Sequence, residues 1–190
     1  FLAQSGARVV GVSDIYGAAY CEKGFTADEL SRCTIAELAR LHSSIERDSL
    51  LELPVDVLVP AAGGHVLDGT TAAKVKAKCV VEAANEPTTR DGDSALEASG
   101  ITVVPDILAN AGGVVASYAE WRQAKSGEVL EREDTFEIIE NCLGRAYSSV
   151  KQAVADFGTS YRQAAHAIAV YEVAQAMVER KWLPGNGQAT

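Results

Sequence analysis

Four near-continuous apolar runs, rich in β-branched residues, constrain the fold more than any other feature of the sequence. They are residues 7–14 (ARVVGVSD), 55–62 (VDVLVPAA), 78–85 (KCVVEAAN) and 101–106 (ITVVPD). Runs without polar alternation are typical of strands covered on both faces, as in a parallel sheet. Helical patterns lie between them, at residues 34–46, 67–75 and 91–99. Strand alternating with helix predicts an α/β fold with a doubly wound parallel sheet.

Beyond residue 106 the pattern is helical throughout. We expect helices at residues 110–124, 136–157 and 161–181, the last ending before Pro184 and Gly185. The middle helix has one apolar face and stops at Gly158, since glycine commonly ends a helix. The chain therefore divides into an α/β part at residues 1–130 and a set of C-terminal helices at residues 131–190.

Composition and charge limit the partners of this chain. A formal net charge of −9 over 190 residues argues against binding to nucleic acid or anionic lipid. No run approaches the roughly 20 apolar residues that a membrane span needs, and the N-terminus does not read as a signal peptide. The four cysteines have no CxxC spacing, so we expect reduced thiols in a cytoplasmic protein and no metal site. The opening FLAQSG reads as a helix end, which indicates a piece of a longer protein.

A polar or small residue follows each predicted strand. Asp14, Ala61 with Ala62, and Asn85 lie at the ends of the first three runs, and Asn110 follows the last run by four residues. In a parallel sheet the carboxyl ends of all strands meet at one edge, where ligands bind in open α/β folds. The sequence therefore predicts a ligand site along this edge.

Asp14 fits the acidic residue that hydrogen-bonds the adenosine ribose of a dinucleotide in a Rossmann-type fold. The alternative interpretation is an exposed loop aspartate. The glycine-rich fingerprint GxGxxG should precede such an aspartate by roughly 20 residues, and it occurs nowhere in the sequence. The dinucleotide interpretation therefore lacks its strongest signal, and both interpretations of Asp14 stay open. If Asp14 does have this role, the chain lacks the first strand of a Rossmann-type sheet and its phosphate-binding turn.

Two glycines, Gly112 and Gly113, stand in the first turn of a predicted helix, where each costs roughly 1 kcal/mol relative to alanine. Asn110 and Ser117 are seven residues apart, so on a helix they share a face with Gly113 between them. This arrangement fits a trough for a flat ring with a small polar molecule beyond it. It fits equally well a helix that packs closely against a strand.

Several segments, in order and at matching separations, resemble a known family. They are GARVVGVSD, PVDVLVPAA, KCVVEAANEPTT, PDILANAGGVVASYAEW and the C-terminal YRQAAHAIAVYEVAQAM. Over nearly its whole length the chain resembles the cofactor-binding domain of the glutamate/leucine/phenylalanine/valine dehydrogenase family, and ANAGGV is a highly specific block. The resemblance implies a dinucleotide-binding domain at residues 1–130, incomplete at its N-terminus. It also implies that the helices at residues 131–190 pack on this domain and face a missing substrate domain.

The resemblance implies a cofactor contact for each of five residues. Asp14 matches the acidic position at the adenosine ribose, and Ala61 and Ala62 match the loop along the adenosine side. Asn85 matches the asparagine at the nicotinamide ribose, and Asn110 the one that hydrogen-bonds the nicotinamide carboxamide. The cofactor is NAD or NADP: the Asp14 carboxylate favours NAD because it would repel a 2′-phosphate, but neighbouring basic residues can offset that repulsion.

Ser117 matches the serine that receives the side-chain carboxylate of the substrate in glutamate-specific members. The implied activity is NAD(P)-dependent reversible oxidative deamination of L-glutamate to 2-oxoglutarate and ammonia, in an assembly that is typically hexameric. Gly112 and Gly113 then leave room for the nicotinamide and the substrate at the helix start. A leucine, phenylalanine or valine dehydrogenase and a non-catalytic nucleotide-binding module are the alternatives.

The activated lysine and the acid–base aspartate of this family belong to its N-terminal domain, which no segment here resembles. We therefore expect no catalytic residue in this chain and no activity from the chain alone. Three features depart from the family pattern: the loop AAGGHV with His65, then Glu86, and Gly92 at a predicted helix start. We interpret His65 as a surface histidine.

Overall fold

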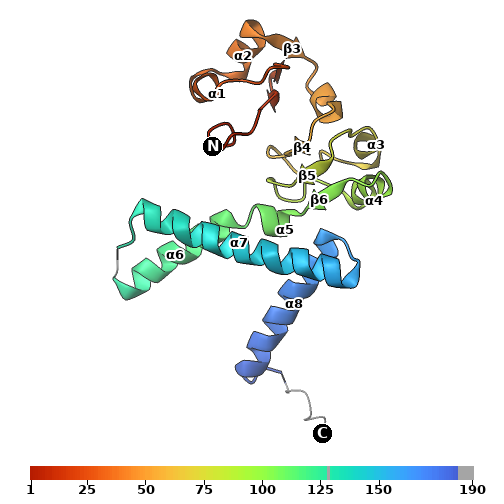
Figure 1. Ribbon diagram of the computed structural model, residues 1–190. Helices are drawn as coiled ribbons and strands as arrows, with labels where there is room; N and C mark the ends of the chain where they lie inside the picture. The colour runs from red at the N-terminus through yellow and green to blue at the C-terminus, as the bar shows by residue number, and fades with distance from the viewer. Residues whose placement is uncertain (128, 184–190) are drawn as a thin grey trace.

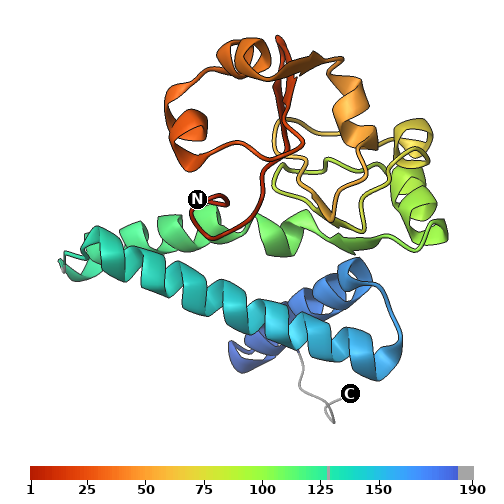
Figure 2. The ribbon, with the colours of Figure 1, turned by 45° about the horizontal axis from the view of Figure 1, so that its top comes forward.

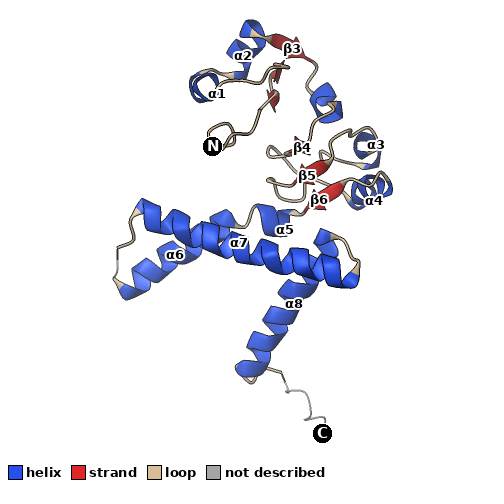
Figure 3. Ribbon diagram, viewed as in Figure 1, coloured by secondary structure: helices blue, strands red, loops and turns tan. Residues whose placement is uncertain are grey.

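The structure is a computed structural model in which residues 1–127 and 129–183 are described. In this part of the chain the strands form two separate three-stranded sheets, and helices alone follow the last strand (Figure 3). The first sheet is antiparallel, with the order β1 (Gly11–Asp14), β2 (Gly17–Tyr20), β3 (Ser43–Ile45). The second is parallel, with the order β4 (Val57–Leu58), β5 (Cys79–Val81), β6 (Thr102–Val104).

The prediction of a single parallel sheet is correct for three apolar runs and wrong for the first. The run at residues 7–14 forms β1, which pairs antiparallel with β2 across a tight hairpin. Asp14 makes that hairpin: its Oδ1 atom accepts hydrogen bonds from the backbone N–H groups of Tyr16 at 2.8 Å and Gly17 at 3.1 Å. An aspartate that bonds the backbone two residues on is a recognised turn former, and this local bond reverses the chain at the point where a parallel strand would have continued into a crossover.

Two short helices cover the antiparallel sheet, α1 (Ala27–Arg32) and α2 (Ile35–Leu41). Each begins with a capping box, in which a threonine and a glutamate three residues later satisfy free N–H groups at the helix start. Ala19, Phe25 and Leu38 form the buried core beneath them. The helix predicted at residues 34–46 ends at Leu41, because the chain turns into β3.

Around the parallel sheet lie the 3₁₀ helix η1 (Asp48–Glu52) and the helices α3 (Gly69–Ala72) and α4 (Arg90–Ala98). Leu58, Leu67, Val80 and Leu96 belong to the core that the strands and these helices share. The predicted helices at residues 67–75 and 91–99 correspond to α3, which is shorter, and to α4. In the three runs that form this sheet only two or three residues each pair as strand, which is fewer than predicted.

The C-terminal helices are α5 (Asp106–Ala109), α6 (Gly112–Ser126), α7 (Arg132–Phe157) and α8 (Tyr161–Glu179). Figures 1 and 2 both show α6 and α7 side by side beneath the sheets. A third core of Leu108, Val150, Ala164 and Ala165, with Val104 packed against it, joins α7 and α8 to β6 and α5. The predicted stop at Pro184 and Gly185 lies outside the described residues. No helix in the described ranges is long and apolar enough to cross a membrane.

Candidate functional site

The segments that follow β4, β5 and β6 are joined by backbone hydrogen bonds at one edge of the parallel sheet. The N–H groups of Ala83 and Ala84 donate to the carbonyl of Pro60, at 3.1 and 2.9 Å, and the N–H of Glu82 donates to the carbonyl of Val104 at 3.0 Å. The segment after β5 is therefore held between its two neighbours. We call this edge the rim; its ends are the exposed pair Ala61 and Ala62 after β4 and the segment leading to Asn110 after β6.

Asn85 and Asn110 meet at the rim, as their positions after β5 and β6 predict. Asn110 Nδ2 donates to Asn85 Oδ1 at 2.6 Å, although the two residues are 25 apart in sequence. Among the described residues, Asn85 Nδ2 and Asn110 Oδ1 have no hydrogen-bond partner. One donor and one acceptor thus remain available beside each other, since each amide side chain has both.

The loop after β4 is packed directly on the turn that carries Asn85. A Cβ added to Gly64 would lie 3.3 Å from the Asn85 carbonyl oxygen, and His65 N–H donates to the Glu86 carbonyl at 2.8 Å. Both His65 and Glu86 have positive φ, 58° and 45°, a conformation that costs energy outside glycine. Two of the three departures from the family pattern, His65 and Glu86, are therefore neighbours that shape the rim, and sequence reasoning did not assign either of them to the site.

A buried ion network supports the rim from below. Glu82 is fully buried, and its carboxylate accepts from Arg162 Nη2 at 2.7 Å and from the backbone N–H of Asp106 at 2.9 Å. Arg162 also contacts Asp93, with Nε to Oδ2 at 3.0 Å, and Asp106, with Nη1 to Oδ1 at 3.8 Å. Burial alone would lower the pKa of Arg162, but the hydrogen bonds from Arg162 to Glu82 and Asp93 outweigh it and raise the pKa above its ordinary value.

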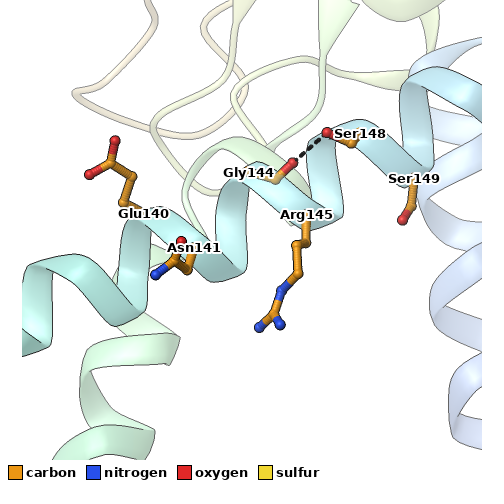
Figure 4. Close-up of a pocket in the computed structure, with 6 residues that line it drawn as sticks. All are labelled: Glu140, Asn141, Gly144, Arg145, Ser148 and Ser149. Carbon is orange, nitrogen blue, oxygen red and sulfur yellow. Dashed lines mark hydrogen bonds between the residues drawn. The ribbon is translucent and has the colours of Figure 1, made fainter.

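Asn85, Asn110, Asp106 and Arg162 also line a cavity of about 620 Å³, together with His166. Its volume is within the usual range of small-molecule pockets, roughly 300–1,000 Å³. A second hollow is lined only by residues of α7, among them Gly144, Arg145 and Ser148 (Figure 4). It is a groove along one helix, without side chains from any other element, so the first cavity is the stronger candidate.

Gly112 and Gly113 occupy the first turn of α6, as predicted, but Asn110 does not belong to that helix. Asn110 ends α5, and the shared helical face expected for Asn110 and Ser117 is therefore wrong. A Cβ on Gly113 would meet no atom within 4 Å, and one on Gly112 would be at an ordinary 3.4 Å from Ile139. Close packing within the described chain thus gives no reason for either glycine. Ser117 is exposed in the second turn of α6.

Asp14 lies in a different sheet from the two asparagines. Its Oδ1 atom is used by the hairpin turn, and its side chain is partly buried rather than a free loop carboxylate. In the described part of the chain, no group of three or more potential ligands is suited to a metal ion.

A family model described as Glutamate/Leucine/Phenylalanine/Valine dehydrogenase matches residues 1–181 of the chain. The chain belongs to this family. It is 37% identical over 186 residues to the cryptic catabolic NAD-specific glutamate dehydrogenase GudB of Bacillus subtilis, covering 96% of this chain and 44% of that relative. It is also 37% identical to the NADP-specific glutamate dehydrogenase of Saccharolobus shibatae, covering 95% of this chain and 44% of that protein.

A solved structure of the same family has a similar fold. The hetero-hexameric glutamate dehydrogenase from Thermus thermophilus, in its Leu-bound form, superposes with a TM-score of 0.78 at 30% identity. The match covers 93% of this chain and 42% of that chain. This chain therefore spans less than half the length of these relatives.

Proposed function

We propose that this chain is the cofactor-binding part of a longer NAD(P)-dependent glutamate dehydrogenase, here called the parent protein. The parent catalyses reversible oxidative deamination of L-glutamate to 2-oxoglutarate and ammonia. The observation that carries the proposal is the Asn85–Asn110 pair, with one free amide donor and one free acceptor at the rim of a parallel sheet. The chain is 37% identical both to an NAD-specific and to an NADP-specific glutamate dehydrogenase. These identities support the proposed reaction but do not distinguish NAD from NADP as the cofactor.

In this proposal the nicotinamide half of the cofactor lies over the start of α6. Asn110 Oδ1 accepts from the carboxamide NH₂, and Asn85 Nδ2 donates to a hydroxyl of the nicotinamide ribose. The open space at Gly113 lets the ring approach the backbone. Ala61 and Ala62 follow the adenosine side, and Asp14 faces the adenosine ribose through the carboxylate oxygen that the hairpin does not use.

We also propose that, in the parent protein, the strands form one doubly wound Rossmann-type sheet. Its first strand lies in a part of the parent protein outside this chain. Within the described residues, β1 and β4 each pair on one side only. Val57 in β4 and Val59 directly after it are each at least a third exposed. Unpaired strand edges with apolar side chains are unfavourable in water. A parallel strand from the parent between β1 and β4 would pair both edges and bring Asp14 to the rim.

The division into residues 1–130 and 131–190 is also part of the proposal. Val170, Tyr171 and Val173 of α8 are more than half exposed, which supports contact with the substrate domain of the parent. The catalytic lysine and the acid–base aspartate are assigned to that domain, and we propose a cytoplasmic homo-hexamer. The four cysteines are free, as they would be in a reducing compartment.

Glutamate as substrate is tested by Ser117→Ala in the parent protein. Loss of a hydrogen bond to a charged carboxylate costs about 1.5–3 kcal/mol, so kcat/KM for glutamate should fall by at least tenfold. A leucine, phenylalanine or valine dehydrogenase would be almost unaffected by the same change. A non-catalytic module would show no turnover before or after it. The 190-residue chain alone should not reduce NAD or NADP with glutamate, and turnover would place the acid–base residues here.

A further inference from the structure

The ion network beneath the rim ties the start of α8 to the asparagine pair. Helix α8 begins below the parallel sheet and runs away from it (Figure 1), and Arg162 is in its first turn. We infer that Arg162 is a positioning residue, which sets the relative placement of Asn85 and Asn110 through Glu82 and Asp106. The inference rests on the proposed function for its consequence in catalysis, but the coupling itself belongs to this chain.

Asp106 connects the network to both asparagines. Its Oδ2 atom accepts from the backbone N–H of Glu86 at 2.8 Å, and Glu86 directly follows Asn85. Its backbone carbonyl accepts from the N–H of Asn110 at 3.0 Å. A displacement of Asp106 therefore moves both ends of the 2.6 Å hydrogen bond between the asparagine side chains.

Arg162 holds Asp106 in place because it neutralises Glu82. Of the cations in the described residues, Arg162 alone is within ion-pair distance of the fully buried Glu82 carboxylate. Without it, a buried charge would be left uncompensated next to Asp106, which is strongly unfavourable. The repulsion would act between the carboxylates of Glu82 and Asp106, both of which Arg162 contacts. Asp106 N–H also donates to Glu82 and so fixes the start of α5, and a shift of the Asp106 side chain would therefore disturb that helix start.

Substitutions separate positioning from general stability. Arg162→Met removes the charge, and Arg162→Lys keeps it but loses the planar fork that reaches Glu82 and Asp93 together. The double variant Arg162→Met with Glu82→Gln removes the buried charge and keeps a carbonyl acceptor for Asp106 N–H. The control is Arg32→Met, since Arg32 forms an exposed 2.8 Å pair with Asp28.

The test measures hydrogen exchange by NMR in the 190-residue chain. The probes are the Asn110 side-chain amide, for the pair, and the backbone amide of the core residue Val80, for global unfolding. In Arg162→Met the Asn110 rate should rise at least tenfold beyond any rise at Val80, with a smaller rise in Arg162→Lys. In the double variant the Asn110 exchange rate should return most of the way to the wild-type rate. In Arg32→Met it should equal the wild-type rate. Should Arg162→Met not fold, the lysine and double variants carry the same comparison.

Equal acceleration at Asn110 and Val80 in these variants would overturn the inference, because Arg162 would then be only a stabilising residue. In the parent protein, Arg162→Met should raise KM for the cofactor at least tenfold, and Glu82→Gln should restore it in part. A parent without glutamate-dependent reduction of NAD or NADP would refute the proposed function and leave the exchange result standing. If the parent protein is active and Arg162→Met leaves its KM for the cofactor unchanged, the positioning role alone would be refuted.

Discussion

Replacing Gly92 by alanine should destabilise the chain, although alanine is the better helix former. Gly92 is in the first turn of α4 and is buried against the segment at Leu67. A Cβ there would lie 2.0 Å from the Leu67 carbonyl oxygen and 3.2 Å from Thr88 Cγ2. Real Cβ contacts stay beyond 3.0 Å. To lengthen the 2.0 Å contact to that limit, α4 or Leu67 must shift by about 1 Å.

The magnitude follows from three contributions. Overpacking a core costs about 1–3 kcal/mol, and the shift weakens the hydrogen bond from Thr89 N–H to the same Leu67 carbonyl, worth about 1 kcal/mol. Alanine returns up to about 1 kcal/mol through helix propensity. The net expectation for Gly92→Ala is a loss of about 1–3 kcal/mol in the free energy of unfolding.

Urea denaturation followed by circular dichroism measures this loss, with Gly144→Ala as the matched control. Gly144 is inside α7 (Figure 4). A Cβ added there would meet no atom within 4 Å outside the helix's own backbone, so alanine should stabilise by roughly 0.5–1 kcal/mol. The two alanine substitutions should thus have opposite signs. If Gly92→Ala leaves the stability unchanged or raises it, the packing of α4 on Leu67 is wrong.

Two other substitutions test the candidate site and a helix cap. Gly113→Ala should raise the free energy of unfolding by up to about 1 kcal/mol, and should lower kcat/KM of the parent by at least tenfold; unchanged kinetics would show that no ligand needs the space. The pKa of Glu29 is lowered from 4.5 to about 2, first by the backbone N–H of Thr26, then by the Thr26 hydroxyl and by His42. Because its folded pKa is depressed, its contribution to stability is present above pH 4.5 and is lost as the pH falls towards 2. The stability gap between wild type and Glu29→Gln should narrow over that range in urea titrations, and a constant gap would contradict this cap.

The sequence predicted the parallel sheet well where a run is followed by a crossover, and failed where a local turn intervenes. The runs before Asn85 and Asn110 lead into helices, and both became parallel strands. The run before Asp14 has the same composition, but the Asp14 side chain closes a hairpin onto the segment GAAY. Glycine and alanine are not typical of strands, and GAAY has no β-branched residue. Apolar periodicity alone therefore did not predict β2.

The candidate site shows the same division between local and long-range signals. Asn85 and Asn110 could be placed together because both follow parallel strands. Glu82 carried a usable signal, since a carboxylate inside an apolar run needs a cationic partner when buried. Its partner, Arg162, is 80 residues away, and no pattern in the sequence distinguishes it from the other basic residues.

The central claim is that the rim formed by Asn85 and Asn110 receives the nicotinamide. A structure of the parent protein with bound NAD or NADP tests it most directly. The account predicts that the carboxamide lies within hydrogen-bond distance, about 3 Å, of Asn110 Oδ1, with the ring over Gly113. A nicotinamide that binds elsewhere, with the Asn85–Asn110 hydrogen bond facing only solvent, would contradict it.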